Sequence, residues 1–199
     1  MDAVTGYSGM RRVLVIGCPG AGKSTFARRL RDAAGLPLHY LDMLWHNPDR
    51  TTVTRAEFDE RLQRILEEDA WILDGNFART LPKRLEYCDT VFFLDFPTDV
   101  CLEGVEGCSG MKREDMRGSN TNSMRSSVST SIDFPAERRP QMVDALEDAA
   151  ARRGVRVHTT SKAELVQALA DVLSGLEVGR ARACLTFIMY RYATYWASR

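Results

Sequence analysis

The chain has 199 residues, 44% of them hydrophobic, and its 27 Lys and Arg residues balance its 27 Asp and Glu residues. This length and apolar content fit a single folded domain with a sizeable core. The formal net charge of zero gives no overall basis for binding to nucleic acid or to a membrane, and we expect neither as a partner.

The cysteines and the N-terminal segment bear on cellular location. The five cysteines form no CxxC pair and no metal-ligand spacing. With no secretion signal and no apolar run as long as a membrane span, an odd number of cysteines predicts reduced thiols in a cytoplasmic protein. Met10, two arginines and a predicted strand make a natural start, so we expect residues 1–10 to be an N-terminal extension.

Strands and helices alternate from the first predicted strand onward. A β-branched run that ends in glycine predicts a buried strand, and Thr54 and Glu57 have the spacing of a capping box. In chain order, the predicted elements here are the strand Arg12–Gly17, the helix Gly22–Arg31, the strand Leu38–Leu41 and the helix Arg55–Glu68. The first strand and the first helix therefore flank a glycine-rich turn.

Two strands and a helix follow in the middle of the chain. They are the strand Trp71–Gly75, the strand Thr90–Asp95 and a helix that Thr98 caps and that ends at about Glu106. The run TVFFLD at Thr90–Asp95 is apolar along its length. Such a run is typical of a strand that is covered on both faces in the middle of a parallel sheet.

The C-terminal part continues the alternation. Its predicted elements are the helix Glu137–Arg153, the strand 155–160 and the helix Ser161–Ser174, which a second capping box opens. Regular alternation of strand and helix predicts a doubly wound α/β fold with right-handed crossovers.

Two segments break the pattern. Residues 117–131, RGSNTNSMRSSVSTS, are rich in Ser, Thr and Asn and have no apolar periodicity, so we expect a flexible polar segment. Residues 177–199 are aromatic and basic and follow the last predicted helix. We treat them as a C-terminal extension of unassigned role, for which a packed helix, a dimer contact and sequence beyond the end of the domain are all open.

The segment GCPGAGKST fits the P-loop or Walker A pattern GxxxxGK[ST] and lies between a predicted strand and a predicted helix. We call Gly17–Ser24 the glycine-rich loop. Its glycines allow backbone N–H groups to cradle a polyphosphate, and the following helix adds its N-terminal dipole. We expect Lys23 to reach the β- and γ-phosphates of ATP and the Ser24 hydroxyl to bind Mg²⁺. The residues expected to bind the nucleotide are Gly17, Pro19, Gly20, Ala21, Gly22, Lys23, Ser24 and Thr25.

The stretch LDGNFART contains two further candidates. Asp74 ends a predicted strand, where open α/β sheets bind their ligands, so it can orient Mg²⁺ or its water ligands. Arg79 follows at a distance suited to a phosphate group. The alternative is an Asp-Gly turn and a solvated arginine.

Two other stretches are weaker candidates. In LDMLW, Asp42 could hold a hydroxyl or amine of an acceptor, although a helix or loop acid explains it nearly as well. Trp45 could stack on a ring, although a lone tryptophan more often packs in the core. In GMKRED, Lys112 and Arg113 could be cations on a closing lid. The alternative is a solvated charge run.

These stretches together resemble a known family. RVLVIGCPGAGKSTFARRL, LDMLWHNP, WILDGNFARTLPKRLEYCDTVFFLDFP and MKREDM are similar to the adenylate-kinase-like P-loop proteins described as DNA topology modulation proteins (FlaR-like). The resemblance covers Arg11 to about Met116, and resumes from Ile132 to about Gly175. The glycine-rich loop is generic, whereas the combination of LDMLW, DGNFART and FLDFP is much more specific.

The resemblance implies a nucleoside-monophosphate-kinase-like, three-layer sandwich over residues 11–176, with a central parallel five-stranded sheet and a lid at about 107–134. It implies that Lys23 and Ser24 serve ATP and Mg²⁺, that Asp74 serves the metal, and that Arg79 and Arg84 serve the transferred or acceptor phosphate. The acceptor-binding residues that it implies are Asp42, Trp45, Asp74, Asn76 and Arg84. The family description suggests an effect on DNA supercoiling, but the residues describe a nucleotide site and no DNA-binding motif.

The chain departs from the family at residues 117–131, where the family has Met-Pro-Trp and then an acidic amphipathic helix. Codons permitted from Met116 onward spell an acidic peptide of that kind when they are read one base later, so a frameshift in the gene is one explanation. A genuine flexible lid is the other. The codons of the gene decide between the two.

The sequence therefore predicts a phosphotransferase that moves the γ-phosphoryl of ATP to a nucleotide or nucleoside. Lys23, Arg79, Lys112 and Arg113 would act by positioning and by stabilising charge. A catalytically weak, DNA-topology-linked nucleotide-binding regulator and a simple NTPase are the alternatives. The identity of the acceptor and the oligomeric state are left open.

Overall fold

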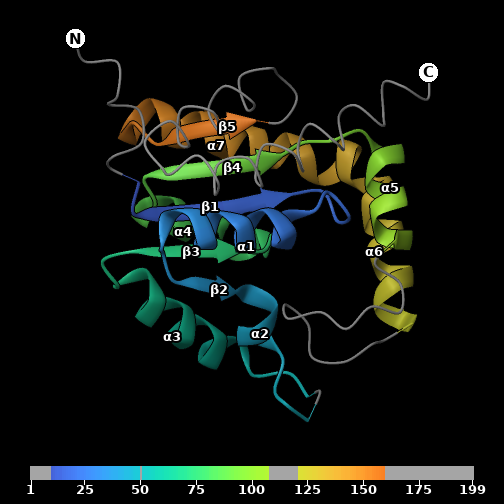
Figure 1. Ribbon diagram of the computed structural model, residues 1–199, viewed down its shortest axis with the longest axis horizontal. Coiled ribbons are helices and arrows are strands. Elements are labelled where there is room, and N and C mark those ends of the chain that lie inside the picture. Colours follow the sequence, from blue (N-terminus) through green and yellow to red (C-terminus); the bar gives the residue numbers. More distant parts are fainter. Residues whose placement is uncertain (1–9, 50, 108–120, 160–199) are drawn as a thin grey trace.

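A computed structural model describes residues 10–49, 51–107 and 121–159, with the backbone alone for 121–125. Its centre is a sheet of five parallel strands in the order β2-β3-β1-β4-β5 (Figure 1). The strands are β1 (Arg12–Gly17), β2 (Leu38–Tyr40), β3 (Trp71–Asp74), β4 (Thr90–Leu94) and β5 (Arg156–Thr159). The predicted α/β fold with a five-stranded parallel sheet is confirmed.

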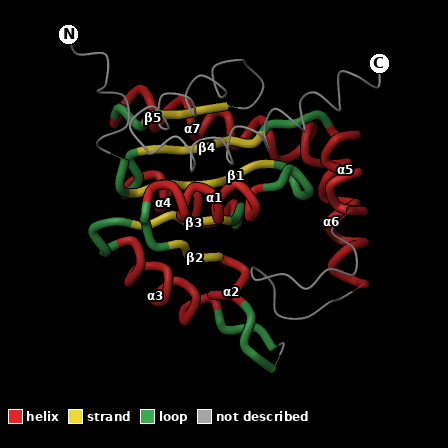
Figure 2. Tube along the Cα trace, viewed as in Figure 1, coloured by secondary structure: helices red, strands yellow, loops and turns green. Residues whose placement is uncertain are grey.

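Helices cover both faces of the sheet. Figure 1 shows α1 in front of the strands and α4 and α7 behind them, and Figure 2 shows the same arrangement by type of element. The strand order explains why both faces are covered. From β1 the chain first builds the sheet towards β2 and then crosses to β4 and β5 on the other side of β1. Right-handed crossovers in these two opposite directions place their helices on opposite faces. The helical elements are α1 (Lys23–Ala34), α2 (Leu41–Trp45), α3 (Arg55–Leu66), the 3₁₀-helix η1 (Ala78–Thr80), α4 (Leu81–Tyr87), α5 (Thr98–Gly107), α6 (Thr121–Asp133), the π-helix η2 (Phe134–Arg138) and α7 (Arg139–Arg153).

The core lies between the sheet and these helices. Every residue of β4 is buried, as expected for an apolar strand inside a parallel sheet. Phe26 of α1 packs on Phe92 of β4 with ring centroids 4.9 Å apart. Burial of such rings removes large apolar areas from water and so supplies most of the stability of the sandwich.

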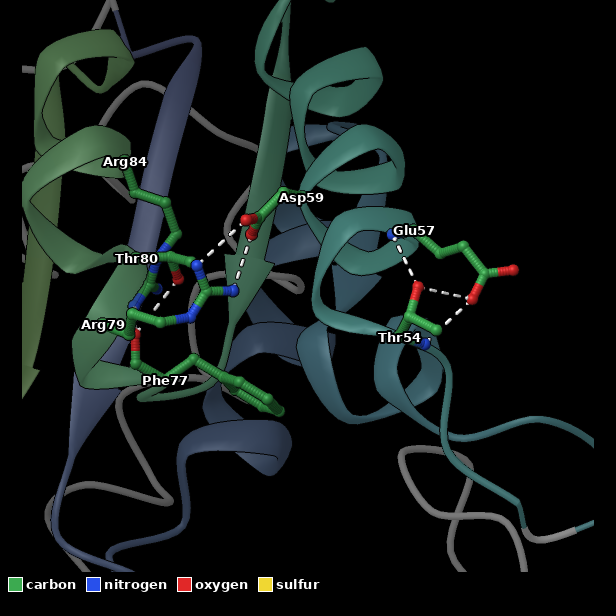
Figure 3. A network of polar contacts seen from close by, with 7 residues as sticks. All are labelled: Thr54, Glu57, Asp59, Phe77, Arg79, Thr80 and Arg84. Atoms are coloured by element: carbon green, nitrogen blue, oxygen red, sulfur yellow. Dashed lines mark hydrogen bonds and ion pairs between the residues drawn. The ribbon is translucent and has the colours of Figure 1, made fainter.

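Helix α3 begins at the predicted capping box. The hydroxyl of Thr54 accepts a hydrogen bond from the Glu57 N–H at 3.2 Å, and the Glu57 carboxylate accepts one from the Thr54 N–H at 2.8 Å (Figure 3). These two bonds satisfy N–H groups that the first helical turn leaves open. The predicted apolar face of the helix is buried: Phe58, Leu62, Ile65 and Leu66.

The prediction of a flexible segment at 117–131 is wrong for its second part, because α6 is helical from Thr121 to Asp133. Tertiary contacts explain the helix, whose composition alone does not favour one. The Ser131 hydroxyl is fully buried and donates towards the carbonyls of Pro19 and Ser127, at 3.1 and 2.8 Å. Helix α6 also packs against α5 (Figure 1).

Other boundaries differ by a few residues. The helix expected from Glu137 begins as an α-helix at Arg139, after the π-turn η2, and the short helices α2 and α4 were not predicted. Residues 1–9, Lys112 and Arg113, the predicted helix Ser161–Ser174 and the tail 177–199 lie outside the described residues. Within the described ranges, no helix combines the length and the apolar character that crossing a bilayer requires.

A histidine at the sheet edge gives a pH-dependent contribution to stability. His158 stacks on Phe92 with centroids 5.1 Å apart, and burial, followed by the charge of Arg156, holds its pKa below the ordinary 6.5. The unfolded chain therefore takes up a proton before the folded chain does, so stability is lost as the pH falls below about 6.5.

We predict that His158→Phe removes this acid-dependent loss. Between pH 7 and pH 5, the free energy of unfolding of the variant should fall less than that of the wild type, because phenylalanine takes up no proton in either state. Urea denaturation at both pH values measures the difference. Equal losses in the two proteins would contradict the prediction.

Candidate functional site

The candidate site lies where the strands end. β1 ends at Gly17, and in the sheet Val15 pairs with Asp74 while Gly17 pairs with Leu94. The glycine-rich loop follows β1 directly and leads into α1 at Lys23. The loop, Asp74 and the end of β4 therefore share the carboxyl edge of the sheet, as open α/β sheets that bind ligands arrange them.

Two glycines of the loop occupy positions that no other residue fits. Gly20 has a φ of 78°, and a Cβ there would lie 1.9 Å from the carbonyl oxygen of Cys101 in α5. Gly17 has a φ of 143°, and a Cβ there would lie 2.3 Å from the carbonyl oxygen of Leu94. The loop thus turns tightly against β4 and α5, which larger residues would prevent.

The start of α1 presents open hydrogen-bond donors. Among the described residues, none accepts a hydrogen bond from the backbone N–H of Gly22, Lys23 or Thr25. Gly22 is the N-cap and supplies no side-chain acceptor. The Lys23 ammonium lies in the same loop and donates to the carbonyl of Cys18 at 3.0 Å. Open N–H groups, a helix N-terminus and a cation together favour an anion.

Asn76 fixes the loop to the end of β3. Its side-chain oxygen accepts from the Gly17 N–H at 3.0 Å, and its side-chain nitrogen donates to the Gly17 carbonyl at 2.8 Å. The sequence suggested that Asn76 contacts an acceptor, whereas here both ends of its amide bind the loop backbone. The arrangement makes it a positioning residue of the loop.

Arg84 is a fully buried arginine of α4. It donates to the carbonyls of Gly75 at 2.9 Å and Phe77 at 3.2 Å, and also to that of Asn76. Burial lowers its pKa to about 9, so the guanidinium stays charged at neutral pH. In this arrangement Arg84 holds the turn that carries Asn76, and its expected contact with a transferred or acceptor phosphate stays a prediction.

Phe77 lies in that turn with an unusual backbone. Its φ of 34° is in the left-handed region, which side chains other than Gly and Asn seldom adopt. The carbonyl of Phe77 accepts hydrogen bonds from Arg84 and from the N–H of Thr80, the latter at 2.9 Å. Backbone strain of this kind persists only where the surroundings hold it, and here the buried arginine does so.

Arg79 is directed towards α3. Its guanidinium forms a two-point ion pair with Asp59, at 2.9 and 2.6 Å (Figure 3). The Arg79 hydrogen bonds lower the pKa of Asp59. Both side chains are more than 40% exposed, so the pair contributes less than about 1 kcal/mol and a phosphate can compete for the arginine.

The remaining acceptor-side candidates are placed as follows. Asp74 is 4% exposed at the end of β3, and Asp42 is exposed in the first turn of α2. Trp45 packs edge-on against Phe58, with centroids 5.6 Å apart, and lies 6.3 Å from the ring of Phe77. This cluster supports the packing interpretation of Trp45.

One ion pair at this edge was not predicted. Asp95, directly after β4, is bound by the Arg139 guanidinium through contacts of 2.9, 2.9 and 2.7 Å. The stretch FLDFP marks Asp95 as a residue at a strand end, but nothing local in the sequence identifies a partner 44 positions away. The pair anchors the start of α7 beside the candidate site.

Two oxygen-bearing side chains of the candidate site have the chemistry of Mg²⁺ ligands. In the described ranges, no three His, Cys, Asp or Glu side chains gather into a metal-binding cluster. Mg²⁺ needs no such cluster, because it is commonly held by one or two protein oxygens together with substrate phosphates and water. The Ser24 hydroxyl and the Asp74 carboxylate are oxygen donors of that kind.

A cavity of about 550 Å³ lies elsewhere, at the amino-terminal edge of the sheet. Its lining residues include Arg11 before β1, Arg12 at the start of β1, Asp89 before β4 and Arg156 of β5. The Asp89 carboxylate accepts from the N–H groups of Arg11 and Arg12 at 3.0 and 2.8 Å. The cavity is therefore at the opposite edge from the glycine-rich loop and does not belong to the candidate site.

Comparison of the chain with protein-family models and with curated proteins gives no match.

We predict that Arg84→Met lowers the free energy of unfolding by about 3 kcal/mol, since the carbonyls of Gly75, Asn76 and Phe77 each lose the donor that the buried arginine supplies. The exposed neighbour on α4 gives the matched control, and Lys83→Met should change stability by less than about 0.5 kcal/mol. Urea denaturation compares the two. A change at Arg84 as small as that at Lys83 would show that the arginine does not hold the turn.

Proposed function

We propose that this chain is a nucleotide-binding phosphotransferase, which moves the γ-phosphoryl of ATP to a small acceptor such as a nucleotide or nucleoside. The observation that supports it most is the set of open N–H groups of Gly22, Lys23 and Thr25. They stand at the start of a helix, next to a lysine, in a loop where a Cβ at Gly17 or Gly20 would collide with the neighbouring backbone. Polyphosphate is the ligand that this combination suits best.

The residues of the loop would share the ATP phosphates. The open N–H groups would bind phosphate oxygens. The Lys23 ammonium would leave its hydrogen bond to the Cys18 carbonyl and bind the β- and γ-phosphates. Ser24 and Asp74 would hold Mg²⁺, which neutralises charge on the β- and γ-oxygens when it is bound. The pairing of Asn76 with Gly17 keeps the loop in place during transfer, so little reorganisation accompanies the reaction.

The acceptor would lie on the α2 and α3 side. Asp42 is exposed there and can bind a hydroxyl or amine. Arg79 is held nearby by a weak, exposed pair with Asp59 and would leave it for an incoming phosphate. Transfer would then rely on positioning and on cations, with no protein nucleophile.

A nucleotide-binding regulator is the second candidate, and a specific observation favours it. Arg84 is buried in the turn after β3, and Arg79 is paired with Asp59. Both guanidinium groups are therefore engaged by protein groups in this conformation. A protein that binds ATP with the loop but transfers its phosphate poorly would have this arrangement.

The test is ADP formation from Mg·ATP, measured with and without a panel of nucleosides, nucleoside monophosphates and other small acceptors. ATP binding is measured in parallel. Lys23→Ala and Gly20→Ala should both lose binding by about tenfold or more, the second because its Cβ would collide with Cys101. Gly107→Ala is the control for Gly20, since a Cβ there meets no atom of the described residues within 4 Å.

The outcomes separate the candidates. ADP formation that requires one acceptor and disappears in Lys23→Ala supports the phosphotransferase and identifies its substrate. ATP binding without ADP formation favours the regulator, and ADP formation that ignores every acceptor favours a simple NTPase. Absence of ATP binding in the folded wild type would overturn all three.

A further inference from the structure

Two buried cysteines meet where the glycine-rich loop touches α5. Cys18 is the second residue of the loop and Cys101 lies in the first turn of α5, and they are 1% and 0% exposed. The Cys101 side chain interacts with that of Cys18, and its thiol also lies 3.6 Å from the carbonyl oxygen of Phe96. The loop backbone also approaches Cys101 closely at Gly20, where a Cβ would lie 1.9 Å from the Cys101 carbonyl oxygen.

The surroundings make Cys18 unlike an ordinary buried thiol. The hydrogen bond from Cys101, a contact with Ser131 and the charge of Lys23 lower its pKa, although burial and Asp95 oppose them. Cys88 provides the contrast, because burial and the nearby Asp89 raise its pKa to about 12. The thiolate is the nucleophilic form of cysteine, so Cys18 is the more reactive of the two.

We propose that Cys18 and Cys101 are an oxidation site, at which hydrogen peroxide converts the two thiols into a disulfide between the glycine-rich loop and α5. Neither cysteine has been given a role in the proposed reaction. Among the described cysteines, Cys101 is the one that interacts with Cys18.

The chemistry balances with peroxide as the two-electron oxidant. The Cys18 thiolate attacks one peroxide oxygen and the O–O bond breaks, which gives a sulfenic acid and, after protonation, one water. The Cys101 sulfur then attacks the Cys18 sulfur, the S–O bond breaks, and the second water leaves with the Cys101 proton. In total, two thiols and one peroxide give one disulfide and two waters.

The link would change the loop. A disulfide needs sulfur atoms about 2.0 Å apart, which is shorter than a hydrogen-bond contact, so the loop must move towards α5. The Cys18 carbonyl that binds Lys23 moves with it. We expect ATP affinity to fall by about tenfold or more, because a displacement of this size misplaces the binding groups. This consequence rests on the proposed function, whereas the formation of the disulfide does not.

The experiment treats the full-length protein with hydrogen peroxide, blocks the remaining thiols by alkylation and maps the peptides by mass spectrometry without reduction. The expected result is a linked pair of peptides that contain Cys18 and Cys101, lighter by two hydrogens than the free pair and lost on treatment with dithiothreitol. ATP affinity is measured before oxidation, after it and after reduction. Since both thiols are covered, we expect formation to be slower than the oxidation of an exposed thiol.

Matched variants isolate the pair. Cys88→Ala should form the link at the wild-type rate, and Cys101→Ala should lose both the link and the effect of peroxide on ATP affinity. If Cys101→Ala does not fold, Cys101→Ser is used in its place. A wild type in which both peptides stay unlinked, or a link that peroxide forms equally fast between other cysteines, would overturn the proposal. Reduced protein that binds no ATP would overturn the proposed function alone, because the peptide map reports on the disulfide independently.

Discussion

Two hydrogen bonds between the side chain of Asn76 and the backbone of Gly17 join the glycine-rich loop to the end of β3. The loop leaves the sheet at the point where its glycines have positive φ, and such a turn has few conformational restraints of its own. Asn76 supplies a restraint from the neighbouring strand. The open N–H groups at the start of α1 are therefore presented by a fixed backbone.

Arg84 stabilises the turn that carries Asn76 and so supports its pairing with Gly17. It binds the carbonyls of three successive residues, Gly75, Asn76 and Phe77, and so fixes the turn from which Asn76 projects. Burial of a charge without a carboxylate partner is costly, and the lowered pKa of Arg84 reflects that cost. The hydrogen bonds offset it, and the left-handed backbone of Phe77 is retained with them. A structural arginine thus determines the geometry of a site that it does not enter.

Local signals explain what the sequence predicted well. The apolar run of β4 and the capping box of α3 each involve only a few consecutive residues, and both are present as expected. The glycine pattern likewise placed a tight turn between β1 and α1. Patterns of this kind depend on backbone chemistry and periodicity, which a single sequence contains.

Long-range partners explain what it predicted poorly. Arg79 and Arg84 are five positions apart, yet one pairs with α3 on the surface and the other is buried against a turn. The helix α6 forms in a Ser-rich stretch because Ser131 packs on the loop more than 100 positions away. The same holds for the pair of Asp95 with Arg139. Nothing in the local sequence distinguishes a cation that will contact phosphate from one that holds the backbone.

The most direct test of the account is to follow backbone amides by NMR while Mg·ATP is added to the ¹⁵N-labelled protein. The account predicts that the amide signals of Gly22, Lys23 and Thr25 shift together and saturate, while that of Gly35 at the other end of α1 stays nearly constant. If the three signals remain unchanged up to millimolar Mg·ATP in the folded protein, the start of α1 does not bind phosphate. The central claim would then be wrong.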